Sequence, residues 1–443
     1  MTPRRTPQEP PRGPRHRCPH PARRPRPAPP ARRPTTHSPA LAVATALATA
    51  CLTLAPVNVA AAEGIAGPCA IASGAGTDEG PMSPAYVRPQ GHKRALMLMV
   101  DFSDLPATTR AADRAGFFSG YGDHFLNRAS FGKYRLDIQP SDDWIRMPRP
   151  WTSYRISRGI PTSVMRGYVR DALEAAQRQG TDVRGADLIF VVADTNVPAP
   201  PTVSQAHTFE GLRAGGTRVG GAALIFGRAA DSALWQRGNF VHEANHLYGL
   251  PDLYNVAEGA SVEYAGGWDT MSMAGISDLL GWHKWKFGWL SRTNVSCVTA
   301  PGNTEHALSP VSAEGANIAV IRTGRHRAIV AEARARSGLD RDICAEGVLL
   351  YTVDSRVPTG GGPVRVVDSR PRSSGGAACA DRLPGELAEM SDAPFGPGES
   401  HTFRDGVHVE VDRGEGAGYR VRVHMPEKHR ADGRHSPGNA GRD

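Results

Sequence analysis

The chain has 443 residues, of which 40% are hydrophobic and 22% are charged. This balance is typical of a folded protein with two or three domains, and it excludes a wholly disordered chain or one with many membrane spans. The net charge of +8 does not indicate a nucleic-acid-binding surface, because residues 1–35 alone carry +9, from ten arginines and one glutamate, and the remainder carries −1.

The first 62 residues predict a leader that is removed from the folded protein. Residues 1–39 are rich in arginine and hold 13 of the 37 prolines, which is typical of a disordered segment. Residues 40–55 form an apolar, alanine-rich run that ends in small residues, the pattern of a secretory signal peptide cleaved near Ala62. We therefore expect a secreted, extracellular protein without stable membrane insertion after cleavage. An uncleaved anchor is the alternative.

Four cysteines follow the predicted signal peptide, namely Cys69, Cys297, Cys344 and Cys379. An even number of cysteines in an oxidising compartment predicts disulfides, and four cysteines allow three pairings. For Cys69 the alternative is a free thiol that blocks a metal ion in a latent form of the protein.

Residues 63–91 are rich in Gly, Ser and Pro and predict a linker or a short pro-segment. Residues 92–292 then alternate between short apolar runs, typical of buried strands, and runs with apolar residues at helical spacing. The expected strands are residues 95–102, 134–138, 187–193 and 222–226, and the expected helices are 113–129, 163–178 with Ser163 as N-cap, and 231–248.

After residue 292 the sequence predicts a β-rich, sandwich-like domain over residues 293–425. Short β-like runs there alternate with turns that contain Gly and Pro. The expected strands are residues 316–322, 328–333, 347–353, 364–367, 407–411 and 419–423. Residues 426–443 are polar and predict a disordered tail.

The most informative segment starts at His242 and reads H-E-x-x-H-x-x-G-x-x-D. His242 and His246 are four residues apart on a predicted helix, so both can bind one zinc ion from the same helix face. Glu243 is then placed to act as general base toward a zinc-activated water. After a turn at Gly249, Asp252 is the best candidate for the third ligand, and another oxygen or histidine donor is the alternative. Three protein ligands leave one position open, as in catalytic zinc sites.

Five further residues are candidates for lesser roles. Tyr254, Tyr264 and His283 are candidates for contact with a substrate or with the reaction's oxyanion, and packing or surface roles are the alternative. Asp101 and Asp104 follow the first expected strand and are candidate Ca²⁺ ligands, with ordinary turn residues as the alternative.

Residues 267–272 (GWDTMS) predict a tight turn that places Met271 as an apolar floor beneath the metal. Together with HEANHLYGLPDLY at 242–254, this turn resembles the Met-turn and zinc helix of the secreted immune inhibitor A-like family of metzincin-type zinc metallopeptidases. LMLMVDFSD, FLNRASFGKYRLD and GWHKWKFGWL resemble other segments of that family, so the resemblance covers about residues 92–292. It implies an α/β zincin catalytic domain with a mixed sheet, a central zinc helix and one catalytic Zn²⁺.

The sequence thus predicts a secreted bacterial zinc endopeptidase that acts on proteins or peptides, with Glu243 as its base. Two alternatives stay open: a secreted binding or adhesion protein on an inactive protease scaffold, and a zinc hydrolase that acts on a non-protein bond. The presence of both histidines, Glu243, Asp252 and Met271 argues against the inactive scaffold.

Overall fold

The computed structural model describes residues 64–275, 277–373, 375, 383 and 385–427. The predicted signal peptide, Cys379 and nearly all of the predicted tail lie outside these residues. Within the described ranges, no helix combines the length and the apolar character needed to cross a membrane. The described residues belong to one compact unit.

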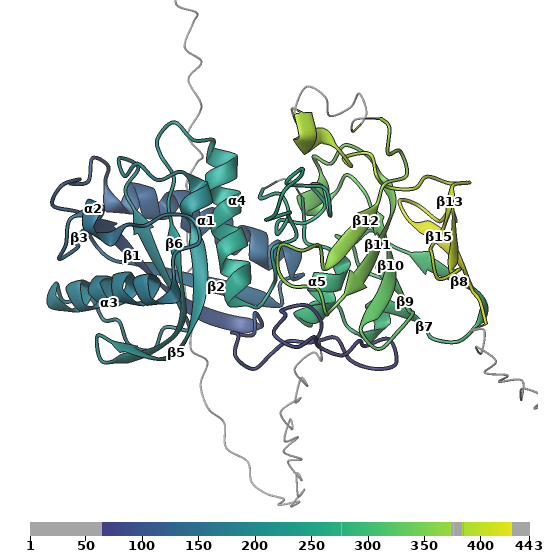
Figure 1. The fold of residues 1–443 in the computed structure, drawn as a ribbon, viewed down its shortest axis with the longest axis horizontal. Coiled ribbons are helices and arrows are strands. Elements are labelled where there is room, and N and C mark those ends of the chain that lie inside the picture. Colours follow the sequence, from purple (N-terminus) through teal and green to yellow (C-terminus); the bar gives the residue numbers. More distant parts are fainter. Residues whose placement is uncertain (1–63, 276, 374, 376–382, 384, 428–443) are drawn as a thin grey trace, which may run out of the picture. The chain divides into compact units, whose positions relative to one another are not determined.

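The first half of the described chain builds a six-stranded sheet (Figure 1). Its strands are β1 (Gly91–Asp101), β2 (Tyr134–Pro140), β3 (Ile145–Arg146), β4 (Leu188–Ala193), β5 (Gln205–Ala214) and β6 (Thr217–Ile225). The strand order is β2-β1-β4-β6-β5, and β3 pairs with the end of β1. All neighbours are parallel except β5, which runs antiparallel to β6 along one edge of the sheet.

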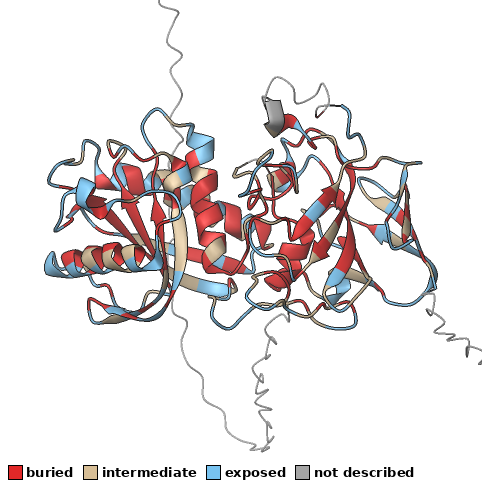
Figure 2. Ribbon diagram, in the orientation of Figure 1, coloured by how far each residue is buried: buried red, intermediate tan, exposed pale blue. Residues whose placement is uncertain are grey.

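Helices cover both faces of this sheet. The described α-helices are α1 (Ala111–Ala129), α2 (Trp151–Tyr154), α3 (Thr162–Arg178), α4 (Ala233–Leu247) and α5 (Gly281–Lys286). α1 and α4 share an apolar core with one face, and α3 shares a second core with the other (Figure 1). Alternation along β1 explains this arrangement, because Met97 and Met99 face the first core whereas Leu98 and Val100 face the second. Figure 2 shows the central strands and most of α4 as buried.

The second half contains two more sheets. Their strands are β7 (Val295–Val298), β8 (Gly302–Leu308), β9 (Ile318–Arg322), β10 (Arg327–Arg334), β11 (Gly347–Asp354), β12 (Val364–Val367), β13 (Ser400–Thr402), β14 (His408–Arg413) and β15 (Tyr419–Met425). One sheet has the order β12-β11-β10-β9-β7 and the other β13-β14-β15-β8. The two sheets share an apolar core, to which Ile329 and Ala331 of β10 and Val409 of β14 contribute. The fold is therefore a mixed α/β structure with several sheets and few helices.

The segment before β1, for which we expected a linker or short pro-segment, packs against distant parts of the chain. Ala72 N donates to Arg325 O between β9 and β10 (2.8 Å), and Val87 N donates to Leu247 O at the end of α4 (3.2 Å). Glu79 in the same segment is only 1% exposed. Residues 64–90 are therefore an integral part of this fold.

A disulfide between Cys69 and Cys297 ties this segment to β7. Cys69 therefore has no free thiol, and the alternative in which it blocks a metal ion is wrong. Cys344 is disulfide-bonded as well. The expected use of these cysteines in disulfides is thus confirmed for the three that the structure describes.

Two boundary predictions are wrong for identifiable reasons. The helix expected to start at Ser163 starts at Thr162, after Pro161 at the N-cap position and without a side-chain cap. Proline suits the start of a helix because its fixed φ and missing N–H cost nothing there. The strand expected over residues 222–226 starts at Thr217, because it pairs with β5, an edge strand that the sequence did not predict.

Candidate metal centre

Helix α4 carries both histidines of the metal-site pattern. It begins after Ser232, whose hydroxyl accepts the backbone N–H of Trp235 (3.5 Å) and so caps the helix. The helix continues through His246, so residues four apart lie on one face. The rings of His242 and His246 are 4.7 Å apart between centroids and nearly perpendicular.

Gly249 allows the chain to turn sharply after α4. Its φ is +85°, a conformation that disfavours any residue with a Cβ. A Cβ at this position would also lie 2.6 Å from the ring of Tyr86. Gly249 N donates to His246 O (2.9 Å), which closes the helix end. The turn then brings Asp252 back toward the two histidines.

The three expected ligands converge on one point. His242 Nε2 and His246 Nε2 are 3.1 Å apart, and each lies 3.1 Å from Asp252 Oδ1. An ion held tetrahedrally at about 2.0–2.1 Å from its ligands requires ligand atoms about 3.3 Å apart. The donor set and its spacing therefore fit a metal ion. Within the described residues, this is the only group of three or more His, Cys, Asp or Glu side chains that could hold one.

Backbone carbonyls orient both imidazoles toward this point. His242 Nδ1 lies 3.0 Å from Thr270 O, and His246 Nδ1 lies 2.8 Å from Leu250 O. A carbonyl oxygen can only accept, so each Nδ1 must carry the hydrogen. In the neutral ring, Nε2 is then left with its lone pair directed at the centre, as a metal ligand requires.

The electrostatics of the three side chains favour a bound cation. Burial raises the pKa of Asp252, but the two imidazoles lower it well below its usual value, so the carboxylate stays ionised. Burial lowers the pKa of His246, but the Asp252 carboxylate more than offsets this and raises it to about 9. Both shifts have the same cause, the attraction between the Asp252 carboxylate and positive charge at this point, and a bound metal ion would experience the same attraction.

Glu243 follows the first expected ligand on α4, and one of its carboxylate oxygens has no partner within the described part of the chain. Glu243 is 4% exposed, and its Oε2 is buried without a hydrogen bond to any residue that the structure describes. Oε1 accepts from Asn239 Nδ2 (3.4 Å), one turn earlier on α4, and Asn239 Nδ2 also lies 3.1 Å from Pro201 O. Burial raises the pKa of Glu243. The sequence did not indicate Asn239, because an asparagine at this position carries no metal or acid–base signature.

The segment around Met271 links the helix to the third ligand. Met271 is fully buried, and its backbone N donates to Asp269 Oδ1 (2.8 Å) within a tight turn. Thr270 O contacts His242, as described above, and Met271 O accepts from Leu253 N (3.0 Å), next to Asp252 in sequence. The turn therefore supports both sides of the metal centre.

The two candidate tyrosines have different surroundings. The ring of Tyr254 stacks beside His242, with centroids 6.0 Å apart and 29° between the planes, and the Arg158 guanidinium lies 5.4 Å from its centroid. Burial raises the pKa of Tyr254. Tyr264 instead packs on β12, with the Arg365 guanidinium 4.1 Å from its ring. Of the two, Tyr254 borders the metal centre.

His283 lies in a buried charge cluster. It has no exposed surface, with Nδ1 2.8 Å from Asp269 Oδ2 and Nε2 3.3 Å from Glu79 Oε2. Burial lowers the pKa of His283, but the two carboxylates raise it to about 9. Burial raises the pKa of Glu79, but His283 and then Lys286 lower it to about 2. Both ring nitrogens contact carboxylates in the core, which agrees with the packing role given as the alternative for His283.

His207 lies on the edge strand β5, and the sequence analysis did not single it out. Burial lowers the pKa of His207 and His246 lowers it further, so the two imidazoles are within electrostatic reach. Thr162 Oγ1 lies 3.2 Å from His207 Nδ1. The partly alternating polar and apolar residues of β5 could have indicated a strand. No motif in the sequence marks His207.

The two candidate Ca²⁺ ligands, Asp101 and Asp104, accept hydrogen bonds from other parts of the chain. Asp101 accepts Arg146 Nε and Nη2 (2.7 and 2.8 Å), and Asp104 Oδ1 accepts the backbone N–H of Trp151 at the start of α2 (2.7 Å). Both carboxylates therefore have structural partners, and the two residues do not form a calcium site.

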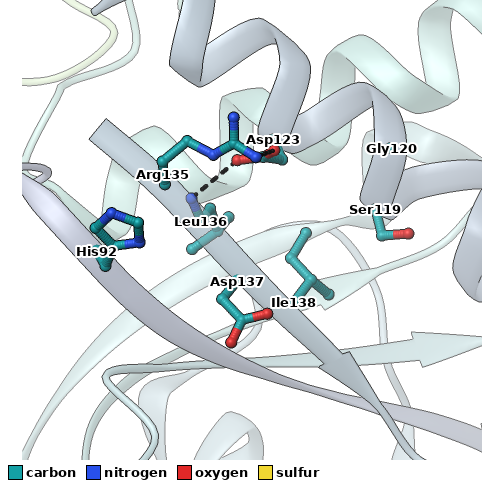
Figure 3. Close-up of a pocket in the computed structure, with 8 residues that line it drawn as sticks. All are labelled: His92, Ser119, Gly120, Asp123, Arg135, Leu136, Asp137 and Ile138. Carbon is teal, nitrogen blue, oxygen red and sulfur yellow. Dashed lines mark hydrogen bonds and ion pairs between the residues drawn. The ribbon is translucent and has the colours of Figure 1, made fainter. Parts of the chain in front are cut away.

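A surface pocket of about 420 Å³ lies between α1, β1 and β2 (Figure 3). Its charged residues are mostly paired: Arg135 lies 3.2 Å from Asp123, which also accepts the backbone N–H of Leu136 (3.1 Å). None of the three metal-centre ligands lines this pocket. It is therefore separate from the candidate site.

Neither the protein-family models nor the curated proteins gave a match to this chain.

Proposed function

We propose that the protein is a secreted zinc endopeptidase of the metzincin type, similar to the immune inhibitor A-like family. The observation that carries this proposal is the convergence of His242, His246 and Asp252 beside a buried Glu243, whose Oε2 has no partner among the described residues. We further infer that the six-stranded sheet with α4 is a zincin-type catalytic domain. The two sheets that follow would then form a sandwich-like domain.

The mechanism assigns distinct roles to the ligands and to Glu243. A bound zinc ion would polarise the scissile carbonyl and promote deprotonation of a water molecule. The two histidines and Asp252 would hold that ion. Glu243 Oε2 accepts the proton from the attacking water as its oxygen bonds to the carbonyl carbon. Glu243 then delivers this proton to the amine nitrogen as the C–N bond breaks, which regenerates its carboxylate.

The surroundings of Glu243 suit both halves of this proton transfer. Asn239 donates to Oε1, and among the described residues Oε2 has no hydrogen-bond partner, so it is free to accept a proton. The burial that raises the pKa of Glu243 brings it closer to neutral pH, where a carboxyl group exchanges protons most effectively. Tyr254, whose ring lies beside that of His242, is our candidate for donating to the developing oxyanion.

The test compares the purified protein with Glu243→Gln, a variant that keeps the shape of the side chain but cannot accept a proton. We expect about one zinc per chain in both proteins by elemental analysis. Casein hydrolysis should fall by a factor of about 10²–10⁴ in the variant, the usual contribution of a general base. Zinc without peptide cleavage in the parent protein would favour a hydrolase of a non-protein bond, and the absence of zinc from both would contradict the metal-site proposal.

A further inference from the structure

The loop between β11 and β12 reaches the metal centre from the β-rich half of the chain. It presents Thr359 and Gly360 to Asp252, more than a hundred residues earlier in sequence. Strand β12 supports this loop, because Arg365 Nη2 donates to Gly361 O (3.2 Å). A segment outside the α/β half therefore contacts the third expected ligand.

The hydroxyl of Thr359 can make two hydrogen bonds to the same aspartate. Its oxygen accepts the backbone N–H of Asp252 (2.8 Å), which leaves the hydroxyl hydrogen free to be donated. Asp252 Oδ2 lies 3.4 Å away and accepts it. The other carboxylate oxygen, Oδ1, is the one that faces His242 and His246. The hydroxyl thus contacts the carboxylate oxygen that does not face the histidines.

Backbone hydrogen bonds also hold the loop, at Asp252 and at the segment that follows it. Gly360 N donates to Asp252 O (2.9 Å), and Val256 N donates to Gly360 O (3.2 Å). Gly360 has a φ of +69°, and a Cβ there would lie 2.4 Å from the side chain of Val256. The loop and the segment after Asp252 therefore form one hydrogen-bonded unit, in which Thr359 supplies the side-chain contact.

We propose that Thr359 is a positioning residue of the metal centre, which orients the Asp252 carboxylate so that Oδ1 binds the metal. The β-rich half would then complete the site rather than act only as an appended module. This inference rests on the proposed metal-dependent function. Partners of this kind typically change metal affinity by about 10–100-fold, because they fix the geometry of the ligand.

The test measures Zn²⁺ affinity of the metal-stripped full protein by competition with a chromophoric chelator. Thr359→Val keeps the shape of the side chain but removes the hydroxyl, whereas Thr359→Ser keeps the hydroxyl. Thr352→Val, in strand β11 of the same hairpin, is the matched control. Thr359 is exposed, so its substitution removes no core contact. We expect a loss of affinity of about 10–100-fold in Thr359→Val only.

A second readout is the visible absorption spectrum of bound Co²⁺, which reports ligand geometry. We expect a changed spectrum in Thr359→Val and the parent spectrum in Thr359→Ser. Parent-like Zn²⁺ affinity and Co²⁺ spectrum in Thr359→Val would overturn the inference, as would equal losses in the valine and serine variants. If Thr359→Val fails to fold, Thr359→Ala replaces it, and its Zn²⁺ affinity and Co²⁺ spectrum are compared with those of the parent and of Thr359→Ser. Failure of the parent protein itself to bind Zn²⁺ would instead contradict the proposed function.

Discussion

At the scale of single residues, the partners of the second ring nitrogen separate the metal-site histidines from the structural one. In His242 and His246, Nδ1 contacts a backbone carbonyl, which leaves the Nε2 lone pair available to a metal ion. In His283, both nitrogens contact carboxylates, which favours the protonated ring and leaves no lone pair. Sequence spacing predicted the first pair. It could not exclude His283, because its partners Asp269 and Glu79 are remote in sequence.

Gly249 is a residue at which stability and the metal site depend on the same backbone geometry. Gly249→Ala must place a Cβ at φ +85° and 2.6 Å from the Tyr86 ring. The backbone conformation alone costs about 1–2 kcal/mol for a residue with a side chain, and displacement of the ring adds to this. We therefore expect the free energy of unfolding, measured with denaturant, to fall by at least that amount.

Gly116→Ala is the control, and we expect it to raise the free energy of unfolding, whereas Gly249→Ala should lower it. Gly116 is an exposed position inside α1, and a Cβ there meets no atom within 4 Å. Alanine in a helix interior is favoured over glycine by about 0.5–1 kcal/mol, so this variant should be slightly more stable than the parent. Unchanged stability in Gly249→Ala would contradict the role of the turn.

At the scale of elements, the sequence predicted the strands and the helix that carry an unbroken apolar run or a spaced motif. β1 and β4 are continuous apolar runs because both faces are covered, and α4 carries the metal-site spacing. The edge strand β5 was missed, because it is only partly buried and its pairing with β6 shifts between Thr208 and Leu212. His207 on that strand was missed for the same reason.

The segment over residues 64–90 could not be predicted from its own composition. It is rich in Gly, Ser and Pro, and its order depends on partners that are remote in sequence, such as Cys297 and Leu247. The role proposed for Thr359 could not be predicted either, because its partner Asp252 is remote in sequence. A threonine in a glycine-containing loop carries no sequence signal for a contact with Asp252.

The disulfide should contribute substantially to the stability of this segment. Cys69 and Cys297 are 228 residues apart, and a crosslink over a long loop restricts the unfolded chain. We expect the double variant Cys69→Ser/Cys297→Ser to lose about 2–5 kcal/mol of unfolding free energy. Hydrogen exchange should also show faster exchange of the amides of residues 64–90 than in the parent. Parent-like stability and protection would show that the noncovalent contacts suffice.

At the scale of the whole molecule, one buried charge cluster joins three parts of the chain. Glu79 belongs to the segment before β1, Asp269 to the Met271 turn, and His283 to α5. Trp282 Nε1 also donates to Glu79 Oε1 (2.7 Å). Buried charges of this kind are stable only as a complete set, because removal of one member leaves the others desolvated without a partner. The cluster therefore couples the N-terminal segment to the support of the metal centre.

This cluster predicts how stability depends on pH. The pKa of His283 is raised from 6.5 to about 9, so its contribution is fully present below pH 6.5 and is lost as pH rises through 9. The pKa of Glu79 is lowered from 4.5 to about 2, so its contribution is present above pH 4.5 and is lost as pH falls through 2. The cluster should therefore stabilise the fold most between pH 4.5 and 6.5.

The measurement is denaturant unfolding of the parent protein and of His283→Gln between pH 4.5 and 9.5 with Zn²⁺ present, so that a bound metal suppresses titration of the ligand histidines. The parent should be the more stable protein at pH 5.5, and the difference between the two should shrink steadily from pH 6.5 to 9, because only the parent loses a proton from His283. Glu79→Gln removes the acidic partner and should reduce the same alkaline loss. A difference between parent and His283→Gln that stays constant up to pH 9 would mean that His283 is neutral in the fold, which would contradict the charged cluster.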